Sequence, residues 1–363
     1  MCFLEKKDYQ QLQQRHMITP KHNGWRMGKG RRKFAFPFPA LSGGNCEGET
    51  MKIVLLGYGS MGKVHLNAYL RMKNVEVVGI YSVSNRGHIH GIRFVDRLDE
   101  ALNLDAEAVD ICLPTFLHRE VFDQALAKGK HVFLEKPVAH TMEDLQAMRD
   151  AAAKSGKKVM VGQVLRYFPE YRRLKERIDP NKPASALCSR RAKLPQGVGN
   201  WFLDRSKSGG VILDLSLHDI DYLRWVLGPV SKIYAQADPD HYYALITMRH
   251  QNGSISRIEG SWRYPGGFAQ EIELAQEGQL FSYSNKQSAP LHVYTENDAE
   301  ADAVELPMVA LRNDPWYQEL SDFVAAIKEN REIPVPLEEA IESTKLALLA
   351  IESANRRQPI AVK

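Results

Sequence analysis

A glycine-rich turn between an apolar segment and a helical segment is the feature that most constrains this chain. Residues 52–56 form a short apolar run, residues 61–72 have helical periodicity, and Gly-Tyr-Gly-Ser-Met-Gly at 57–62 connects the two. In such a unit the first glycine permits a tight turn, the second lets the backbone approach a phosphate, and the third allows close packing of helix on strand. The free N–H groups at the start of the helix attract an anion.

This G-x-G-x-x-G turn predicts a dinucleotide-binding site, and a purely structural glycine turn is the alternative. The residues expected to contact the pyrophosphate are Gly57, Gly59, Ser60, Met61 and Gly62.

The segment that should recognise the adenosine ribose follows the next predicted strand, 75–81. A carboxylate at this position is typical of NAD binding, whereas a basic group accommodates the 2′-phosphate of NADP. The segment holds Ser82, Ser84 and Arg86 and no carboxylate. Hydroxyl and guanidinium groups can both donate to a phosphate. The sequence therefore favours NADP and leaves NAD open, with a solvated loop arginine as the alternative interpretation of Arg86.

Apolar runs and helical segments alternate from Met51 to residue 165. Strands are predicted at 52–56, 75–81, 94–95, 108–113, 131–134 and 158–162, and helices at 61–72, 97–102, 120–128 and 142–154. Alternation at this spacing indicates parallel strands joined by right-handed crossovers. Residues 51–165 are therefore predicted to form a Rossmann domain of the α/β class with a doubly wound parallel sheet.

The pattern changes after residue 165. Helices are predicted at 167–178, 211–227, 315–329 and 337–355, and serial strands at 232–237, 242–249, 254–262, 269–275 and 280–284. Serial strands joined by short turns, such as Asn252-Gly253, indicate antiparallel pairing. Residues 166–363 are therefore predicted to form an α+β domain with a large, mostly antiparallel open sheet.

The first 50 residues differ from the rest of the chain in charge. They hold nine Lys or Arg and four Asp or Glu, whereas the chain from Met51 onward holds 39 basic and 40 acidic residues. The net charge of +4 thus comes from a leader that we expect to be disordered or not native, with Met51 as the natural start. Arg31-Arg32 before a short apolar stretch weakly resembles a twin-arginine export signal, but Pro37 and Pro39 interrupt the stretch.

Composition argues against several classes of protein. No apolar run approaches the roughly 20 residues of a membrane span, and a neutral body lacks the basic, aromatic surface of a nucleic-acid binder. The four cysteines, Cys2, Cys46, Cys112 and Cys188, have no metal-like spacing with histidine. We therefore expect a cytoplasmic protein with reduced cysteines, no metal, and neither a membrane nor a nucleic acid as its partner.

A lysine follows the predicted strand 131–134, in the sequence Glu135-Lys136-Pro137. Ligands of an open α/β sheet gather at the carboxyl ends of its strands, which places Lys136 near the expected cofactor. An ammonium there can hold a substrate hydroxyl or stabilise charge on oxygen during hydride transfer. A surface lysine with no part in chemistry is the alternative.

A carboxylate and an imidazole share one face of the predicted helix 211–227. Asp214 and His218 are i,i+4 neighbours, and Asp221 continues the same face. A carboxylate beside an imidazole fixes its tautomer and raises its basicity, which suits removal of a proton from an alcohol. A capping aspartate and a surface histidine are the alternative.

Four separated motifs stand in order along the chain. They are the glycine turn at 57–62, Cys-Leu-Pro-Thr-Phe-Leu-His at 112–118, Lys-His-Val-Phe-Leu-Glu-Lys-Pro at 130–137, and Ser-Gly-Gly at 208–210 followed by Asp214, His218 and Asp221. Together they resemble the glucose–fructose oxidoreductase / inositol dehydrogenase / rhizopine-catabolism (Gfo/Idh/MocA) family. The resemblance implies an NAD(P)-dependent oxidoreductase whose second domain, 166–363, binds substrate and mediates oligomerisation.

The resemblance also implies roles for single residues. Lys136, before a proline that is often cis in the family, would lie beside nicotinamide and substrate. His218 would be the general base, and Asp214 would orient the substrate or assist the histidine. Arg166, which opens the second domain, would contact the substrate together with these three. Further cofactor contacts are implied for Pro114, Thr115, His118, Glu135 and Lys136.

Departures from the family pattern leave the substrate open. Ser208 replaces the first of three usual glycines, and Ser216 occupies a position that often holds another small residue. A sugar, cyclitol or related polyol is expected, and a non-sugar diol is the alternative; Trp262, Arg263 and Tyr264 are possible sugar contacts. The family often pairs its second-domain sheets, which implies a homodimer or homotetramer. A non-catalytic NAD(P)-sensing regulator of the same fold is a further alternative, although it has no need for the lysine, aspartate and histidine.

Overall fold

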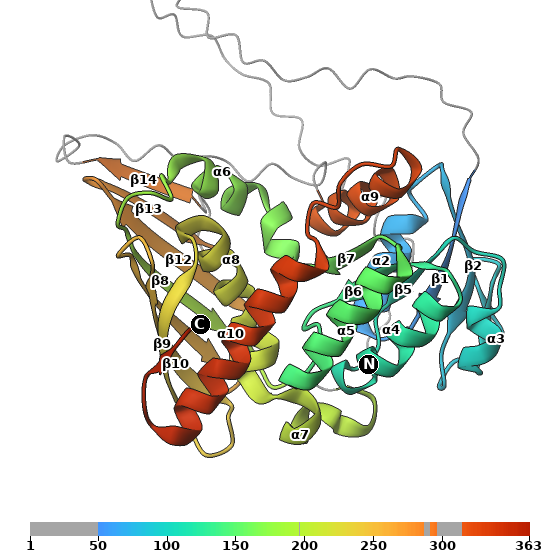
Figure 1. The fold of residues 1–363 in the computed structure, drawn as a ribbon, viewed down its shortest axis with the longest axis horizontal. Coiled ribbons are helices and arrows are strands. Elements are labelled where there is room, and N and C mark those ends of the chain that lie inside the picture. The colour runs from blue at the N-terminus through green and yellow to red at the C-terminus, as the bar shows by residue number, and fades with distance from the viewer. Residues whose placement is uncertain (1–49, 196, 287–290, 296–313) are drawn as a thin grey trace, which may run out of the picture. The chain divides into compact units, whose positions relative to one another are not determined.

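The computed structural model describes residues 50–195, 197–286, 291–295 and 314–363 (Figure 1). The leader of 50 residues lies outside the described residues except for Thr50. The predictions of disorder and of an export signal, and the residues Cys2 and Cys46, therefore also fall outside them. Among the described helices, none is both long enough and apolar enough to cross a membrane.

Seven strands form the first sheet, in the order β3-β4-β2-β1-β5-β6-β7. All neighbouring pairs are parallel except the short β3–β4 ladder. The strand order runs outward from β1 in both directions, which is the doubly wound arrangement that the alternating sequence predicted. The strands are β1 (Met51–Leu56), β2 (Val75–Tyr81), β3 (His88–Ile89), β4 (Ile92–Val95), β5 (Ala108–Ile111), β6 (His131–Glu135) and β7 (Val159–Gly162).

Helices cover both faces of this sheet, because successive strand residues point to opposite faces. Val54 belongs to a core with the first group of helices, whereas Ile53 and Leu55 belong to a core with the second group. The first group is α3 (Leu98–Leu102), α4 (His118–Ala127) and α5 (Met142–Ser155), and the second is α2 (Ser60–Tyr69) and α9 (Pro315–Lys328). Since α9 packs against α2, a C-terminal helix belongs to the core of the first sheet. The predicted boundary at residue 165 therefore lies between the two sheets, but α9, which follows this boundary in sequence, packs in the core of the first sheet.

Eight strands form the second sheet, in the order β14-β13-β12-β8-β11-β10-β9-β15. All neighbouring pairs are antiparallel except β8–β11. This confirms the large, mostly antiparallel sheet expected from the sequence. The strands are β8 (Ser185–Arg191), β9 (Val230–Ala237), β10 (Tyr243–His250), β11 (Ile255–Ser261), β12 (Ala269–Gln276), β13 (Gln279–Ser284), β14 (Leu291–Thr295) and β15 (Ile360–Ala361).

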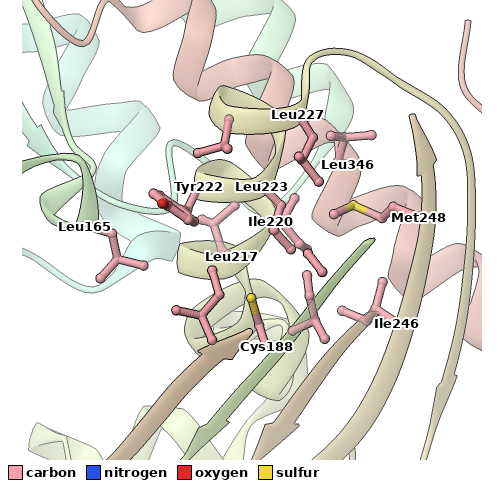
Figure 2. Close-up of a cluster of buried hydrophobic side chains, with 14 of the residues drawn as sticks. Leu165, Cys188, Leu217, Ile220, Tyr222, Leu223, Leu227, Ile246, Met248 and Leu346 are labelled. Atoms are coloured by element: carbon pink, nitrogen blue, oxygen red, sulfur yellow. The ribbon is translucent and has the colours of Figure 1, made fainter. Parts of the chain in front are cut away.

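An apolar cluster joins the second sheet to two helices. Figure 2 shows Leu217, Ile220 and Leu223 of α8 (Leu217–Leu227) among side chains such as Met248 of β10 and Leu346 of α10 (Leu337–Arg356). Burying such side chains stabilises the fold by about 1.5–3 kcal/mol each. The packing fixes the rotation of α8, and therefore the direction in which its polar face points. The remaining helices are α6 (Pro169–Arg177) and the short α7 (Arg205–Ser208).

The structure differs from the sequence prediction at two places that matter for the site. The segment 185–191, for which no strand was predicted, is the central strand β8. The single helix predicted over 211–227 is a π-helical turn, Ile212–Ser216, followed by α8. A π-helical turn shifts the phase between the residues before and after it, and such turns occur frequently at functional sites.

A buried carboxyl group under the first sheet gives the fold a measurable pH dependence. Glu319 of α9 is fully buried, and neither of its carboxyl oxygens has a hydrogen-bond partner among the described residues. Burial raises the pKa of Glu319 well above its ordinary value, and the carboxylates of Glu135 and Asp110 raise it further, although His65 opposes them. Folding therefore favours the protonated acid. Above the unfolded-state pKa, ionisation in the unfolded chain makes folding less favourable.

We predict that Glu319→Gln, which imitates the neutral acid, becomes more stable than the wild type as the pH rises. Between the unfolded and folded pKa values the wild type loses roughly 1.4 kcal/mol of unfolding free energy per pH unit from this group. The two proteins should have similar thermal midpoints near pH 5 and clearly different midpoints at pH 8. Glu332→Gln, an exposed control, should show no such divergence. A constant difference between Glu319→Gln and wild type would contradict the prediction.

Candidate active site

The glycine turn between β1 and α2 has the shape of a phosphate cradle. Gly57 has φ +106°, and a Cβ atom there would stand 2.5 Å from the carbonyl oxygen of Cys112. A Cβ atom on Gly62 would stand 2.1 Å from the carbonyl oxygen of Gly57, whereas one on Gly59 would meet open space. The first and third glycines are therefore required by packing, and the second leaves room for a ligand.

The start of α2 leaves the room and the polarity that an anion needs. No described side chain caps this end of α2, which begins at Ser60, and its first turn contains no acidic residue. The free N–H groups and the positive end of the helix dipole therefore face the space beside Gly59. The turn fits the pyrophosphate of a dinucleotide.

His118 fastens together two loops that border the cradle. Its Nδ1 lies 2.9 Å from the carbonyl oxygen of Pro137, and its Nε2 lies 2.9 Å from that of Leu113. The ring is fully buried, and burial lowers the pKa of His118. Both ring nitrogens face backbone carbonyls, so His118 supports the loop that carries Pro114 and Thr115 rather than facing outward itself.

Lys136 and Asp214 meet although 78 residues separate them in sequence. Lys136 follows β6 and precedes Pro137 through a cis peptide bond. Its Nζ donates to the carbonyl oxygen of Asp214 at 2.9 Å and to the carboxylate Oδ1 at 3.0 Å. The side chains of Lys136 and Asp214 are 13% and 19% exposed, so both still reach solvent. A charged, partly exposed pair at the carboxyl end of β6 is suited to bind a polar ligand.

His218 is the second residue of α8 and is half-buried. Burial lowers the pKa of His218 well below its ordinary value, and the positive charges of Lys136 and Arg190 lower it further. The imidazole is therefore neutral at neutral pH and can accept a proton. Its Nδ1 is buried without a hydrogen-bond partner in the described part of the chain.

The structure corrects the expectation that Asp214 fixes the tautomer of His218. The Asp214 carboxylate binds Lys136, and no hydrogen bond joins it to His218 among the described contacts. The π-helical turn Ile212–Ser216 explains this, because the i,i+4 geometry of a regular α-helix does not hold across it.

Two buried arginine–aspartate pairs hold α8 in place. Arg166 donates to both carboxylate oxygens of Asp221, from Nε at 2.8 Å and from Nη2 at 2.7 Å. Arg190 of β8 binds Asp219 in the same bidentate way, with both distances 2.8 Å. Asp221, expected to extend the catalytic face, is therefore structural. Arg166 is 5% exposed and committed to Asp221, so a direct substrate contact by Arg166 stays a prediction that this geometry does not favour.

A buried polar network that the sequence did not predict lies behind Lys136. His65 of α2 places Nδ1 2.8 Å from a carboxylate oxygen of Asp110 and Nε2 3.2 Å from one of Glu135. Burial opposes a charge on His65, but the Asp110 carboxylate and Cys112 raise its pKa well above the ordinary value. Glu135 in turn accepts a hydrogen bond from the backbone N–H of Lys136 at 3.0 Å.

The network connects the glycine turn, β5 and the loop of Lys136. The Cys112 thiol completes the network by donating to an oxygen of Asp110 at 3.3 Å. These hydrogen bonds explain why the side-chain N, O and S atoms of His65, Asp110 and Cys112 lie close together. An acidic residue inside the apolar strand 108–113 was the sequence signal that could have revealed it. Glu135, predicted to contact the cofactor, faces this network and is 7% exposed.

The predicted adenosine-binding residues lie together at the end of β2. The Ser82 hydroxyl accepts hydrogen bonds from the backbone N–H of Asn85 at 3.2 Å and from its side chain at 2.8 Å. The Arg86 guanidinium donates to backbone carbonyls of its own loop, and its Nη2 lies 3.5 Å from Asp96. The sequence did not predict a carboxylate at this site. Asp96 lies next to the end of β2 because β4, which it follows, pairs with β2. Ser84 is exposed beside them.

A glycine cradle, a doubly wound sheet and a charged pair at its carboxyl edge define a dinucleotide-binding protein. Family models identify residues 51–163 as "Oxidoreductase family, NAD-binding Rossmann fold" and residues 171–279 as the "GFO/IDH/MocA C-terminal domain". The chain therefore belongs to the Gfo/Idh/MocA family and is an oxidoreductase with an NAD-binding Rossmann fold. This confirms the resemblance seen in the four motifs.

Similar proteins match nearly their whole length. An uncharacterized oxidoreductase, YrbE, of Bacillus subtilis is 24% identical over 85% of this chain and 96% of its own. Inositol 2-dehydrogenase of Rhizobium meliloti is 24% identical over 86% of this chain and 99% of its own. The crystal structure of GenD2 from gentamicin A biosynthesis in complex with NAD has the same fold, with a TM-score of 0.76, 21% identity, and coverage of 87% of this chain and 97% of GenD2.

We predict that the pKa of His218 lies below 6.5 in the wild type and rises in Lys136→Met. The substitution removes a positive charge that disfavours protonation of the imidazole. An NMR titration of the imidazole C2 proton, assigned with His218→Gln, measures both values. Lys154→Met, an exposed control on α5, should leave the pKa of His218 unchanged. A wild-type pKa at or above 6.5, or no rise in Lys136→Met, would refute this electrostatic description.

Proposed function

We propose that this protein is an NAD(P)-dependent dehydrogenase that transfers a hydride between nicotinamide and a hydroxyl-bearing carbon of a sugar, cyclitol or related polyol. The observation that carries the proposal is the Lys136–Asp214 pair beside a His218 held neutral by its surroundings, at the strand edge that also carries the glycine turn. An ammonium, a carboxylate and a neutral imidazole are the groups that oxidation of an alcohol requires.

Each of the three groups has a distinct part in the proposed reaction. The neutral imidazole of His218 takes the hydroxyl proton in the direction of oxidation and returns it in the direction of reduction. The ammonium of Lys136 stabilises the negative charge that develops on the substrate oxygen. Asp214 holds that ammonium at 3.0 Å and offers its second carboxylate oxygen to a neighbouring hydroxyl. When bound, the nicotinamide supplies or accepts the hydride.

The substrate class rests on the relatives together with these polar groups. Proteins that match over most of their length include inositol 2-dehydrogenase and myo-inositol 2-dehydrogenase. Polyols present adjacent hydroxyls, which a paired ammonium and carboxylate can bind together. A non-sugar diol offers the same pair of hydroxyls and is the second candidate. A non-catalytic sensor would not require an ammonium, a carboxylate and a neutral imidazole at this position, which disfavours that alternative.

Two further expectations belong to the same proposal. The outer face of the second sheet exposes Leu187 and Ile255, each 46% exposed, and pairing of two such faces in a homodimer or homotetramer would bury them. The cysteines in the described part of the chain, Cys112 and Cys188, are free thiols, which suits the cytoplasm.

We predict that Lys136→Ala and His218→Ala each lower kcat by about 10²–10⁴-fold, the usual contribution of a general acid–base or charge-stabilising group. Dinucleotide binding, followed by quenching of protein fluorescence, should change little, because the glycine turn is unaltered. A screen of inositols, aldoses, amino sugars and diols with both cofactors identifies the substrate for this test. The control Lys154→Ala should retain wild-type kcat. Near-wild-type turnover in both active-site variants would remove the proposed roles.

We predict that the protein prefers NADP, and that Arg86→Ala lowers kcat/KM for NADP by about tenfold while leaving that for NAD nearly unchanged. The reason is that a guanidinium can leave its backbone partners to form a charge-assisted pair with the 2′-phosphate. Steady-state kinetics with the two cofactors measure this. A tenfold wild-type preference for NAD, or an equal loss with both cofactors in Arg86→Ala, would contradict the prediction.

A further inference from the structure

A second pocket, outside the proposed active site, lies where α6, the end of α8 and the segment before α10 meet. Its volume is about 260 Å³, and neither Lys136, Asp214 nor His218 lines it. Apolar walls come from Trp225 and Val335, and charged groups come mainly from α6. Nothing in the proposed reaction uses this pocket.

The charges that line the pocket are unbalanced. They comprise Arg166, Arg172, Lys175 and a single acid, Glu176. Asp221 compensates Arg166 through the bidentate pair described above. Arg166 also lies 3.6 Å from Glu339, and Arg172 interacts electrostatically with Asp322, whereas Lys175 forms no ion pair with a carboxylate within the described residues. Among the cations that line the pocket, Lys175 is therefore the one without a carboxylate beside it in the described residues.

Lys175 lies between the indole ring of Trp225 and the charge of Arg166. Its side chain is half-buried, and its Nζ lies 5.5 Å from the centre of the Trp225 ring. The Arg166 guanidinium lies 5.4 Å from the centre of the same ring. Burial lowers the pKa of Lys175, and the charge of Arg166 lowers it further. An anion beside Lys175 would relieve this repulsion.

The walls of the pocket restrict what kind of anion fits. An indole ring and aliphatic side chains favour a flat, apolar body over a hydrated one. The guanidinium of Arg166 already uses its fork on Asp221, and Arg172 donates from Nε to the carbonyl oxygen of Arg166 and lies over the Tyr167 ring, so the cation beside the indole that still needs a counter-charge is Lys175. A single ammonium beside an aromatic wall suits a carboxylate attached to a ring.

We propose that this pocket binds a small organic anion in which a carboxylate is attached to a planar ring. The carboxylate lies against Lys175 within reach of Arg172, and the ring packs on Trp225. The pocket and the proposed active site are different sites, so the proposal does not depend on the reaction assigned above.

Benzoate is a suitable probe, and benzamide is its uncharged match. Calorimetric titration of the full chain, without substrate and with NADP present to fill the dinucleotide site, should show binding of benzoate and much weaker binding of benzamide. In Lys175→Gln the affinity for benzoate should fall by about fivefold, the size expected for a partly buried ion pair. Arg173→Gln, exposed on the same helix and outside the pocket, is the matched control and should bind like the wild type.

A second measurement keeps the test decisive if Lys175→Gln is poorly folded. Benzoate should quench tryptophan fluorescence in the wild type and lose that quenching in Trp225→Phe, while thermal midpoints report that both proteins are folded. Three results would overturn the proposal: equal binding of benzoate and benzamide, equal binding to Lys175→Gln and Arg173→Gln, or competition between benzoate and NADP.

Discussion

The contact between Lys136 and Asp214 is the interaction on which the rest of the site depends. It joins a loop of the first sheet to the π-helical turn above the second sheet, at 3.0 Å between Nζ and Oδ1. A charged pair of this kind is costly to desolvate, and it is retained here where both members still reach solvent. The contact fixes the position of the Lys136 ammonium relative to α8. The positive charge of Lys136 therefore adds to the effect of burial and lowers the pKa of His218.

Buried polar groups on both sides hold this contact in position. Behind Lys136, His65 connects the glycine turn to Asp110 and Glu135. Around α8, the pairs Arg166–Asp221 and Arg190–Asp219 fix the helix by four charge-assisted hydrogen bonds. Such pairs add little net stability compared with apolar packing, but their directional geometry specifies one arrangement. The reaction proposed above requires three groups in fixed positions around a substrate, and a single specified arrangement suits that requirement.

The fold was predictable to the extent that local pattern determines it. The alternation of apolar and helical segments predicted the first sheet, and serial strands predicted the second. The strand β8 escaped prediction because its neighbours in the sheet, β11 and β12, are more than 60 residues away in sequence. The π-helical turn at Ile212–Ser216 was not predicted from the helical periodicity of 211–227, and across it the expected hydrogen bond between Asp214 and His218 is not found among the described contacts.

The sequence by itself determined which chemical groups are present and which backbone turns are possible. Gly57 and Gly62 are required where a Cβ atom would collide with backbone, and the four ordered motifs predicted the family correctly. Tertiary structure alone decided which charged groups meet. Lys136 pairs with Asp214, Arg166 is occupied by Asp221, and Lys175 lies over the Trp225 ring with no carboxylate partner in the described part of the chain. The physical reason is that glycine turns and periodicity act over a few residues, whereas ion pairs form between side chains that only the packing of distant helices and strands brings together.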